Sequence, residues 1–219
     1  MSTELYLIHT GFLEDEELFS HKLKQVSKER RERVEACRLK GDRLRSLAGG
    51  LLLEELVRQY YYSPEDLSRD EKGKLFLPGE DTFYFNLSHS GDYAACAISD
   101  CPVGVDIQQF RPVKDGLAKR FFQYQETEEI REAKGKRKEE LFFRYWTAKE
   151  SYIKLIGDGL KRELNSFSVC LESGRVEDVK EEQEDAYLKE YFCLEDYAIT
   201  IAARNNQFSR FVKKIIYRL

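Results

Sequence analysis

The sequence lacks the features that mark membrane and secreted proteins. No apolar run approaches the length of a membrane span, and the opening residues carry no basic segment ahead of an apolar one. The five cysteines are scattered and form no Cys-x-x-Cys pair, which favours buried or free thiols in a reducing compartment. We therefore expect a cytoplasmic protein with no membrane partner.

Several ligand classes are also disfavoured by what is missing. Three histidines and five scattered cysteines offer no zinc-ligand spacing. The chain has no Gly-x-x-x-x-Gly-Lys-[Ser/Thr] loop, the element with which many phosphotransferases hold a nucleotide. Acidic residues outnumber Lys and Arg by 40 to 36, and the net charge of -4 argues against a nucleic-acid partner, although it permits a local basic patch.

What the chain contains is typical of a globular protein of mixed α and β structure. Its 219 residues, 42% of them hydrophobic, suffice for one large core or two small ones. Strand and helix patterns alternate in two blocks, which predicts two α+β halves, residues 1–102 and 103–219, that share a core or pack closely. Asp-Tyr-Ala recurs at 92–94 and 196–198, each time opening a predicted strand, which fits a duplicated unit.

The first half reads as a strand, helices and a hairpin. Its predicted elements are a strand over 4–10, a cationic amphipathic helix over 14–38, a second helix over 42–61, and hairpin strands over 83–87 and 93–98. Gly49-Gly50 inside the second helix lowers helix propensity, so we expect another element to pack closely there. Residues 88–91, Ser-His-Ser-Gly, are predicted as the turn of the hairpin.

The second half opens with an alternating strand over 103–108, which aims Asp106 and Gln108 at the face opposite its aliphatic residues. The remaining predictions are short helices over 115–122 and 126–133, an exposed basic loop over 135–139, a long helix over 141–160, an acidic surface loop around 177–185, and strands over 167–171, 187–194, 197–203 and 211–217.

The long helix over 141–160 carries the most unusual pattern. Trp146, Glu150 and Lys154 recur at i, i+4 and i+8, so they form one stripe. A carboxylate and an ammonium group one turn apart, beside a large aromatic ring, fit a reactive site. They equally fit a helix-stabilising ion pair worth about 0.2–0.5 kcal/mol. The spacing alone leaves both interpretations open.

Two further stretches carry polar side chains in positions that suit chemistry. They are the Ser-His-Ser-Gly turn with His89, and the strand end Gly104-Val105-Asp106. Each also has an ordinary explanation, because a histidine in a turn is commonly a polar loop residue and an aspartate commonly caps a turn.

Taken in order, the three stretches closely resemble the Sfp-type 4′-phosphopantetheinyl transferases. That family has an Asn-[Ile/Leu]-Ser-His-Ser-Gly turn, a Gly-x-Asp strand and a Trp-x-x-Lys-Glu-[Ser/Ala]-x-x-Lys helix, which stand here at 86–91, 104–106 and 146–154. The likeness covers about residues 30–169, including Gly73-Lys74. It implies a monomer of two pseudo-symmetric halves, each a small antiparallel sheet packed with helices, with the active site between them.

The resemblance also implies a reaction. The phosphopantetheine arm of coenzyme A would move to a serine of an apo acyl or peptidyl carrier protein, with release of adenosine 3′,5′-bisphosphate. Asp106 and Glu150 match the carboxylates that hold Mg²⁺, for which Mn²⁺ is an alternative. Glu150, or a metal-bound water beside it, would be the base, and Lys154 would neutralise or protonate the leaving phosphate.

One position departs from the family pattern. Gln108 stands where many members have a second acid, so either its carbonyl oxygen ligates the metal or water takes that place. We expect an altered or weaker metal dependence. Gln108 is also the only feature that favours the alternative function, a non-catalytic relative that binds coenzyme A or a carrier protein without transfer.

The resemblance assigns several residues to coenzyme A, with His89 at its 3′-phosphate. The matching positions are Arg45, Lys74, Ser88, His89, Asp106 and Lys154, followed by Arg30, Arg33, Ser46 and Glu126 as further positions near the nucleotide or the metal. The cationic run that holds Arg30 and Arg33 equally suits an acidic carrier protein. Residues 123–140 are a candidate carrier-docking surface. Lys149 is expected to face the phosphates or the solvent, and Trp146 to fix the helix by packing.

Overall fold

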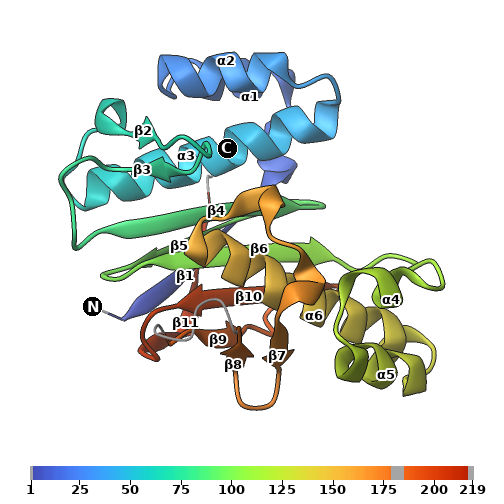
Figure 1. Cartoon of the computed structure of the whole chain (residues 1–219). Helices are drawn as coiled ribbons and strands as arrows, with labels where there is room; N and C mark the ends of the chain where they lie inside the picture. Colours follow the sequence, from blue (N-terminus) through green and yellow to red (C-terminus); the bar gives the residue numbers. More distant parts are fainter. Residues whose placement is uncertain (1, 179–184, 217–219) are drawn as a thin grey trace.

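The computed structural model describes residues 2–178 and 185–216, apart from the side chain of Leu160. Two sheets, each covered by a long helix, build the molecule (Figure 1). The main helices are α1 (Glu16–Leu23), α2 (Lys28–Ala36), α3 (Lys40–Gln59), α4 (Leu117–Phe121), α5 (Tyr124–Glu132) and α6 (Lys136–Ile156). None of the helices in the described ranges is long and apolar enough to cross a membrane.

The strands of the two sheets come from both ends of the chain. The strands are β1 (Thr3–His9), β2 (Ser68–Arg69), β3 (Leu75–Phe76), β4 (Tyr84–Ser90), β5 (Tyr93–Ser99), β6 (Val103–Gln109), β7 (Ser168–Cys170), β8 (Arg175–Glu177), β9 (Tyr187–Glu190), β10 (Tyr197–Ala203) and β11 (Phe208–Ile215). The first sheet has the order β11-β1-β5-β4 and the second β6-β10-β9-β8-β7, while β2 and β3 pair separately.

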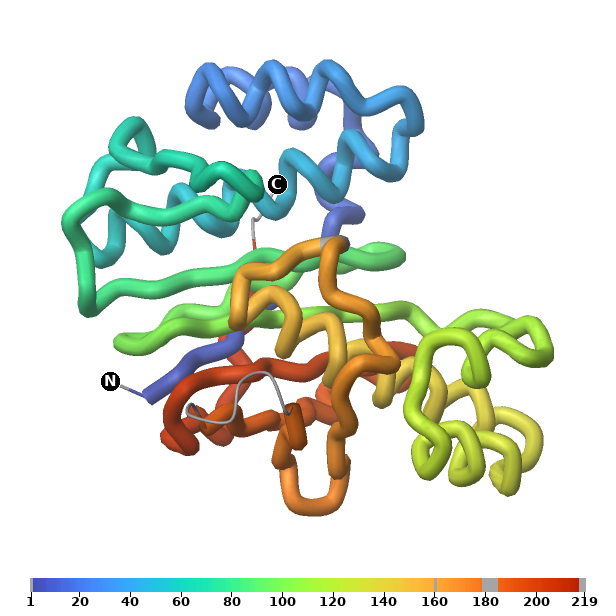
Figure 2. The backbone as a smooth tube through the Cα atoms, viewed as in Figure 1, coloured from blue at the N-terminus to red at the C-terminus, as the bar shows by residue number. Residues whose placement is uncertain are grey.

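The α+β prediction is confirmed, with one departure in the first sheet. Strand pairs are antiparallel except β1 with β11, which is parallel. In Figure 2 the red end of the chain returns to the blue beginning, so the first sheet takes its edge strand from the second half of the sequence.

Each sheet buries one face against its own helix and the other face against the second sheet. Leu47 and Leu52 of α3 are fully buried in a cluster with Phe85 of β4. Phe142 of α6 belongs to a second cluster with Ala202 of β10. A third cluster joins the inner faces of the sheets and consists of Leu5, Leu7, Ala95, Ala97, Val103, Val105, Ile107, Tyr191, Tyr197, Ile199, Ile201 and Ala203. The prediction of a shared core is therefore confirmed.

The two halves repeat one arrangement of strand, strand and helix. β1 pairs antiparallel with β5 beneath α3, as β6 pairs with β10 beneath α6. The amide of Thr10 donates to the carbonyl of Asp92 at 2.8 Å, and the amide of Phe110 donates to the carbonyl of Asp196 at 2.8 Å. The repeated Asp-Tyr-Ala thus occupies equivalent places, which confirms the prediction of a duplicated unit.

Glycine allows two close approaches that position the helices. A Cβ atom on Gly104 of β6 would lie 2.0 Å from the carbonyl oxygen of Ser151 and 2.5 Å from the amide of Leu155, so α6 crosses β6 at this residue. A Cβ on Gly50 would lie 2.5 Å from the Arg30 side chain, which confirms the predicted close packing. At Gly49 the nearest atom would be at an ordinary 3.8 Å.

Several local predictions were wrong. The helix predicted over 14–38 breaks after Leu23, because the amide of Ser27 donates to Glu54 of α3 at 3.0 Å and Ser27 then caps α2. Ser88, His89 and Ser90 belong to β4, and only Gly91 and Asp92 turn.

The basic loop predicted over 135–139 is the first turn of α6, with Gly135 as its N-cap. The short strands β2, β3 and β8 were not predicted. The middle of the acidic loop predicted around 177–185 and residue 217 lie outside the described residues.

Candidate active site

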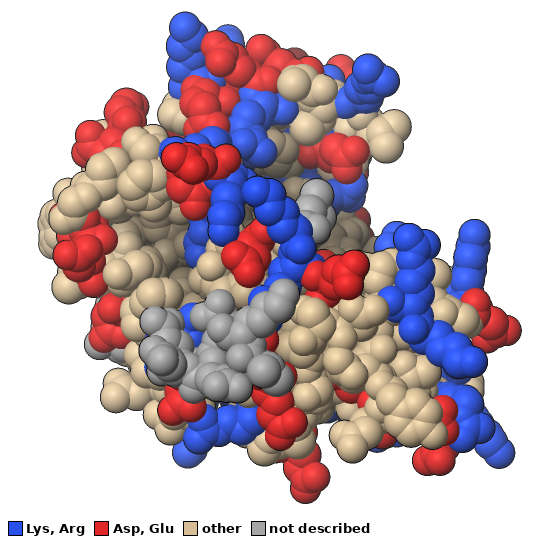
Figure 3. Space-filling view, viewed as in Figure 1, with Lys and Arg blue, Asp and Glu red and all other residues tan. Residues whose placement is uncertain are grey.

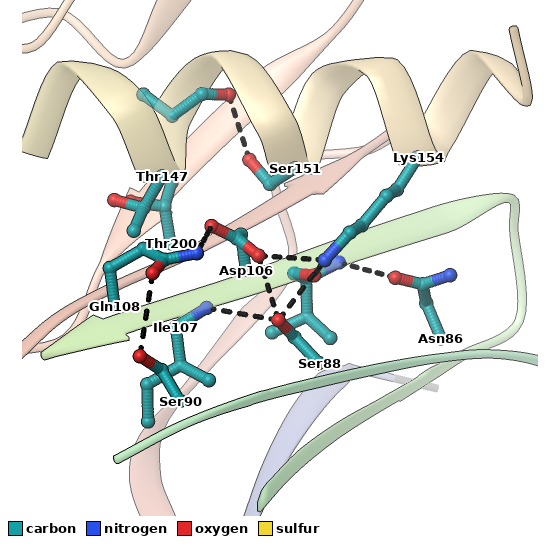
Figure 4. Close-up of polar contacts among 12 residues, drawn as sticks. Asn86, Ser88, Ser90, Asp106, Ile107, Gln108, Thr147, Ser151, Lys154 and Thr200 are labelled. Atoms are coloured by element: carbon teal, nitrogen blue, oxygen red, sulfur yellow. Dashed lines mark hydrogen bonds and ion pairs between the residues drawn. The ribbon is translucent and has the colours of Figure 1, made fainter. Parts of the chain in front are cut away.

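The candidate site lies where the edge strands of the two sheets meet under α6 (Figure 4). Asp106 points from β6 towards α6 and is only 2% exposed. Its Oδ1 accepts hydrogen bonds from Ser88 Oγ at 2.7 Å and Lys154 Nζ at 2.7 Å. Charge-assisted bonds of this length hold both side chains firmly in place.

Lys154 uses all three of its donors on strand residues. Besides Asp106, its Nζ donates to Ser88 Oγ and to the Val105 carbonyl, both at 3.0 Å. No ion pair joins it to Glu150, although both residues are described. The helix-stabilising pair that the i, i+4 spacing allowed is therefore not formed, because the aspartate of the neighbouring strand takes the ammonium group.

Glu150 is a half-buried carboxylate with no hydrogen bond or ion pair to the described residues. Burial raises its pKa, and the nearby charge of Asp106 raises it further, while Lys154 acts in the opposite direction. Two carboxylates in one poorly hydrated place hold negative charge that a cation would neutralise.

Gln108 shares the face of Asp106, as the strand pattern predicted. Its Nε2 donates to Asp106 Oδ2 at 3.2 Å, and its Oε1 accepts from Ser90 Oγ at 3.4 Å. The carboxylate oxygens of Asp106 and Glu150, with the amide oxygen of Gln108, are hard donors that suit Mg²⁺. Because the described ranges contain no group of three or more His, Cys, Asp or Glu side chains suited to a metal, water would have to complete the coordination.

A basic cavity of about 250 Å³ adjoins this centre on the α3 side. It brings together seven of the residues that the resemblance assigned to coenzyme A, namely Arg30, Arg33, Arg45, Ser46, Lys74, Ser88 and His89. In Figure 3, Lys and Arg side chains gather in a band between α2 and α6, with acidic side chains interspersed. The cavity therefore suits an anionic ligand.

Two basic residues of this cavity are held by the backbone of the protein. Lys74 Nζ donates to the carbonyls of Lys154 at 2.7 Å and Leu155 at 3.4 Å, in the last turn of α6, where the helix dipole favours a cation. Arg45 donates to the carbonyl of Gly91 at 3.0 Å. Lys74 thereby ties the first half of the chain to the helix that carries Lys154.

His89 lies in the wall of the cavity beside α3. The protein around the ring limits its hydration, and this lowers the pKa of His89, as do the charges of Arg45 and Lys154. A phosphate placed beside the ring would favour its protonated form.

One basic residue of the cavity was missed by the sequence reasoning. Arg69 of β2 donates to Glu29 at 2.8 Å and to the carbonyl of Gly73 at 2.6 Å, next to Lys74. It belongs to no motif, and only the pairing of β2 with β3 brings it to this wall.

The structure does not bring Glu126 to this site. Glu126 is 2% exposed. Its carboxylate pairs with Lys149 at 2.9 Å and also accepts hydrogen bonds from the amides of Gln123 and Val169. The ion pair and the hydrogen bonds of this carboxylate are all formed with residues of the second half. The expectation that it lies near the nucleotide or the metal was therefore wrong.

Lys149 faces neither the phosphates nor the solvent, contrary to expectation. It is fully buried, and its ammonium group also donates to the carbonyls of Leu164 and Phe167. These contacts make it a structural cation that ties α6 to the chain leading into β7.

A second, larger cavity of about 680 Å³ opens on the other side of the centre. Trp146, Glu150 and Lys154 line it together, so the stripe predicted from the helix spacing is a real surface. Trp146 packs edge-on against Phe121 and stacks on Phe142, which confirms its packing role. The charged centre therefore separates a basic cavity from a more apolar one.

Comparisons with known proteins agree with the arrangement of the site. A family model described as the 4′-phosphopantetheinyl transferase superfamily matches residues 102–202, and one described as the N-terminal part of a 4′-phosphopantetheinyl transferase matches residues 14–101. Similar relatives include the 4′-phosphopantetheinyl transferases ffp of Bacillus subtilis, 34% identical, and Sfp of Bacillus subtilis strain 168, 32% identical, each over 88% of both chains.

A mammalian relative extends the comparison. The L-aminoadipate-semialdehyde dehydrogenase-phosphopantetheinyl transferase of Mus musculus is 30% identical over 86% of this chain and 70% of its own. The motifs at 86–91, 104–106 and 146–154 lie within the matched families' ranges. The chain belongs to the 4′-phosphopantetheinyl transferase family.

Proposed function

We propose that the protein transfers the 4′-phosphopantetheine arm of coenzyme A to a serine hydroxyl of an apo carrier protein. The observation that carries this proposal is the centre itself: Asp106 and Lys154 are paired, Glu150 is unpaired beside them, and a basic cavity adjoins one side and a larger cavity the other. This arrangement suits an anionic nucleotide, a metal and a second substrate that meet at one place.

The basic cavity would bind the nucleotide part of coenzyme A. His89 and Arg45 would contact its 3′-phosphate, and Lys74 would lie near the pyrophosphate, where its place at the end of α6 keeps it close to Lys154. Arg30, Arg33 and Ser46 would line the remainder of the nucleotide site. Because the cations already converge before the ligand enters, little ordering is needed on binding.

Asp106 and Glu150 would hold Mg²⁺, or Mn²⁺ in its place, with Gln108 as a third oxygen donor directly or through water. The metal, when bound, would polarise the pyrophosphate and stabilise the phosphate that leaves. The unpaired carboxylate of Glu150, whose pKa is raised by burial and by Asp106, supports this assignment, since a cation would relieve the repulsion.

In the transfer, the serine oxygen forms a bond to the β-phosphorus of coenzyme A. The bond from that phosphorus to the bridging oxygen breaks, and this oxygen leaves as part of adenosine 3′,5′-bisphosphate. The serine proton would pass to Glu150, whose carboxylate lies at this centre without a hydrogen bond or ion pair to the described residues. Lys154 neutralises charge on the leaving phosphate.

Both halves of one chain contribute to this site, since Lys74 and His89 come from the first half and Asp106 and Glu150 from the second. We therefore propose a monomer. Its free cysteines suit a reducing compartment, and we propose that it acts in the cytoplasm. The carrier protein would approach the second cavity, and residues 123–140, which include α5 and the start of α6, would form part of its docking surface.

The test is transfer to an apo carrier domain in the presence of coenzyme A and Mg²⁺, followed by mass spectrometry of the carrier. We expect the mass to rise by one phosphopantetheine with the wild type and not with Glu150→Gln. Binding of coenzyme A without any mass gain on several apo acyl and peptidyl carriers would refute transfer and identify a non-catalytic binding protein.

A further inference from the structure

Hydrogen bonds from backbone amides to side chains join the edges of β4 and β6. In a continuous sheet the acceptors of such bonds would be backbone carbonyls. β4 is the last strand of the first sheet and β6 the first strand of the second, and the two run side by side (Figure 4). Three amides of β6 donate to side chains of β4: Val105 to Asn86 Oδ1 at 3.0 Å, Ile107 to Ser88 Oγ at 3.3 Å, and Gln109 to Ser90 Oγ at 3.0 Å.

These three bonds follow the two-residue period of a strand. Asn86, Ser88 and Ser90 share the face of β4 that meets β6, while Phe85 and Leu87 face α3. The register is therefore unique, because a slip by one residue would turn apolar side chains to the seam and leave buried amides of β6 without acceptors. We call Asn86, Ser88 and Ser90 the seam residues.

Ser88 differs from the other seam residues in having no capacity left for a ligand. A serine hydroxyl has one donor and two acceptor positions. Its donor goes to Asp106 Oδ1 at 2.7 Å, and its acceptor positions receive Lys154 Nζ at 3.0 Å and the amide of Ile107 at 3.3 Å. The residue as a whole is only 8% exposed.

We propose that Ser88 is a positioning residue, which sets Asp106 and Lys154 relative to one another, and that its side chain does not bind the 3′-phosphate. Its catalytic consequence rests on the proposed function. His89 alternates to the opposite side of β4, beside Arg45 in the basic cavity. The two neighbouring residues therefore have different roles. His89 faces the nucleotide cavity, whereas Ser88 faces the carboxylate of Asp106 and the ammonium group of Lys154.

The first test measures binding without a carrier protein, so it is independent of transfer. The ratio of the dissociation constants of 5′-AMP and adenosine 3′,5′-bisphosphate reports the contribution of the 3′-phosphate. We expect Ser88→Ala to keep the wild-type ratio and His89→Ala to reduce it towards one. A ratio that falls equally in Ser88→Ala would make the serine a phosphate ligand and overturn the proposal.

The second test separates positioning from general stability. Asn86→Ala removes the same kind of seam bond from β6, but Asn86 has no hydrogen bond to Asp106, Gln108 or Lys154 among the described residues. We expect both alanine variants to unfold at lower urea concentrations than the wild type. Only Ser88→Ala should lose kcat, by roughly 10- to 100-fold, as is common when the partner of a metal-binding carboxylate is removed.

Ser88→Thr, which keeps the hydroxyl, should recover most of that loss. If the wild type transfers phosphopantetheine and Ser88→Ala keeps its kcat, the positioning role is refuted. If the wild type itself transfers nothing to apo carriers, the proposed function fails, and the binding ratios still decide whether Ser88 contacts the phosphate.

Discussion

Among the glycines, Gly104 is the one at which an added methyl group should most reduce stability and activity. The Cβ of Gly104→Ala would lie 2.0 Å from the carbonyl oxygen of Ser151, 2.5 Å from the amide of Leu155 and 3.0 Å from the carbonyl carbon of Lys154. All three are backbone atoms of α6, so no side chain can rotate away. To reach the 3.0 Å at which real Cβ contacts begin, the helix must withdraw from β6 by about 1 Å.

This displacement should reduce both stability and activity. Overpacking of a well-packed interior costs about 1–3 kcal/mol, and each kcal/mol lowers the melting temperature of a chain of this size by roughly 2–4 °C. The helix carries Glu150 and Lys154, while Asp106 stays on the strand, so the two sets of charged groups separate. A misplacement of about 1 Å can lower a rate roughly 100-fold.

Gly49→Ala is the matched control, since its Cβ would meet only Ala94 at 3.8 Å and the residue lies inside α3. This variant should gain up to about 1 kcal/mol from helix propensity. Urea unfolding measures the stabilities, and phosphopantetheine transfer at saturating coenzyme A measures kcat of Gly104→Ala. Wild-type stability and kcat in Gly104→Ala would show that α6 does not cross β6 as closely as described.

Three further predictions concern substitutions that change the charge in or near the site. Without metal, Glu150→Gln should melt at a higher temperature than the wild type above pH 7. A carboxyl group whose pKa is raised in the folded state makes the folded protein less stable as the pH rises from 4.5 through that pKa, and glutamine has no such group. The difference in melting temperature should vanish below pH 4.5, and equal melting temperatures at both pH values would contradict the raised pKa. Gln108→Glu should lower the Mg²⁺ concentration needed for half-maximal transfer, whereas an unchanged requirement would show that residue 108 is not a significant ligand. Lys149→Met should lower the free energy of unfolding by about 3–5 kcal/mol, because it leaves the buried carboxylate of Glu126 without its cation. The double variant Lys149→Met with Glu126→Gln should recover part of this lost free energy. If urea unfolding shows an equal loss in the single and double variants, the pairing is excluded.

Much of the site was readable from the sequence because its residues lie in short, rigid pieces of regular structure. Alternation along a strand decides that Asp106 and Gln108 share a face, and helical spacing decides that Trp146, Glu150 and Lys154 share one. Both follow from local geometry alone, and both were confirmed.

The partners of those residues were not readable, because they are chosen by contacts between distant segments. Helical spacing allowed Lys154 to pair with Glu150, but the crossing at Gly104 brings Asp106 within reach instead. Burial of α6 likewise decides that Lys149 pairs with Glu126, which no local pattern indicated.

The sequence by itself thus determined the α+β class, the duplicated unit, the order of the motifs and the faces on which the reactive side chains stand. These properties depend on period, propensity and residue type over a few neighbouring positions. Only the tertiary structure decided that Glu150 stays unpaired, that Glu126 is structural and that the hydroxyl of Ser88 is consumed by Asp106, Lys154 and β6. Hydrogen bonds and charges are shared among segments many residues apart, and their distribution is settled only when the two sheets meet beneath α6.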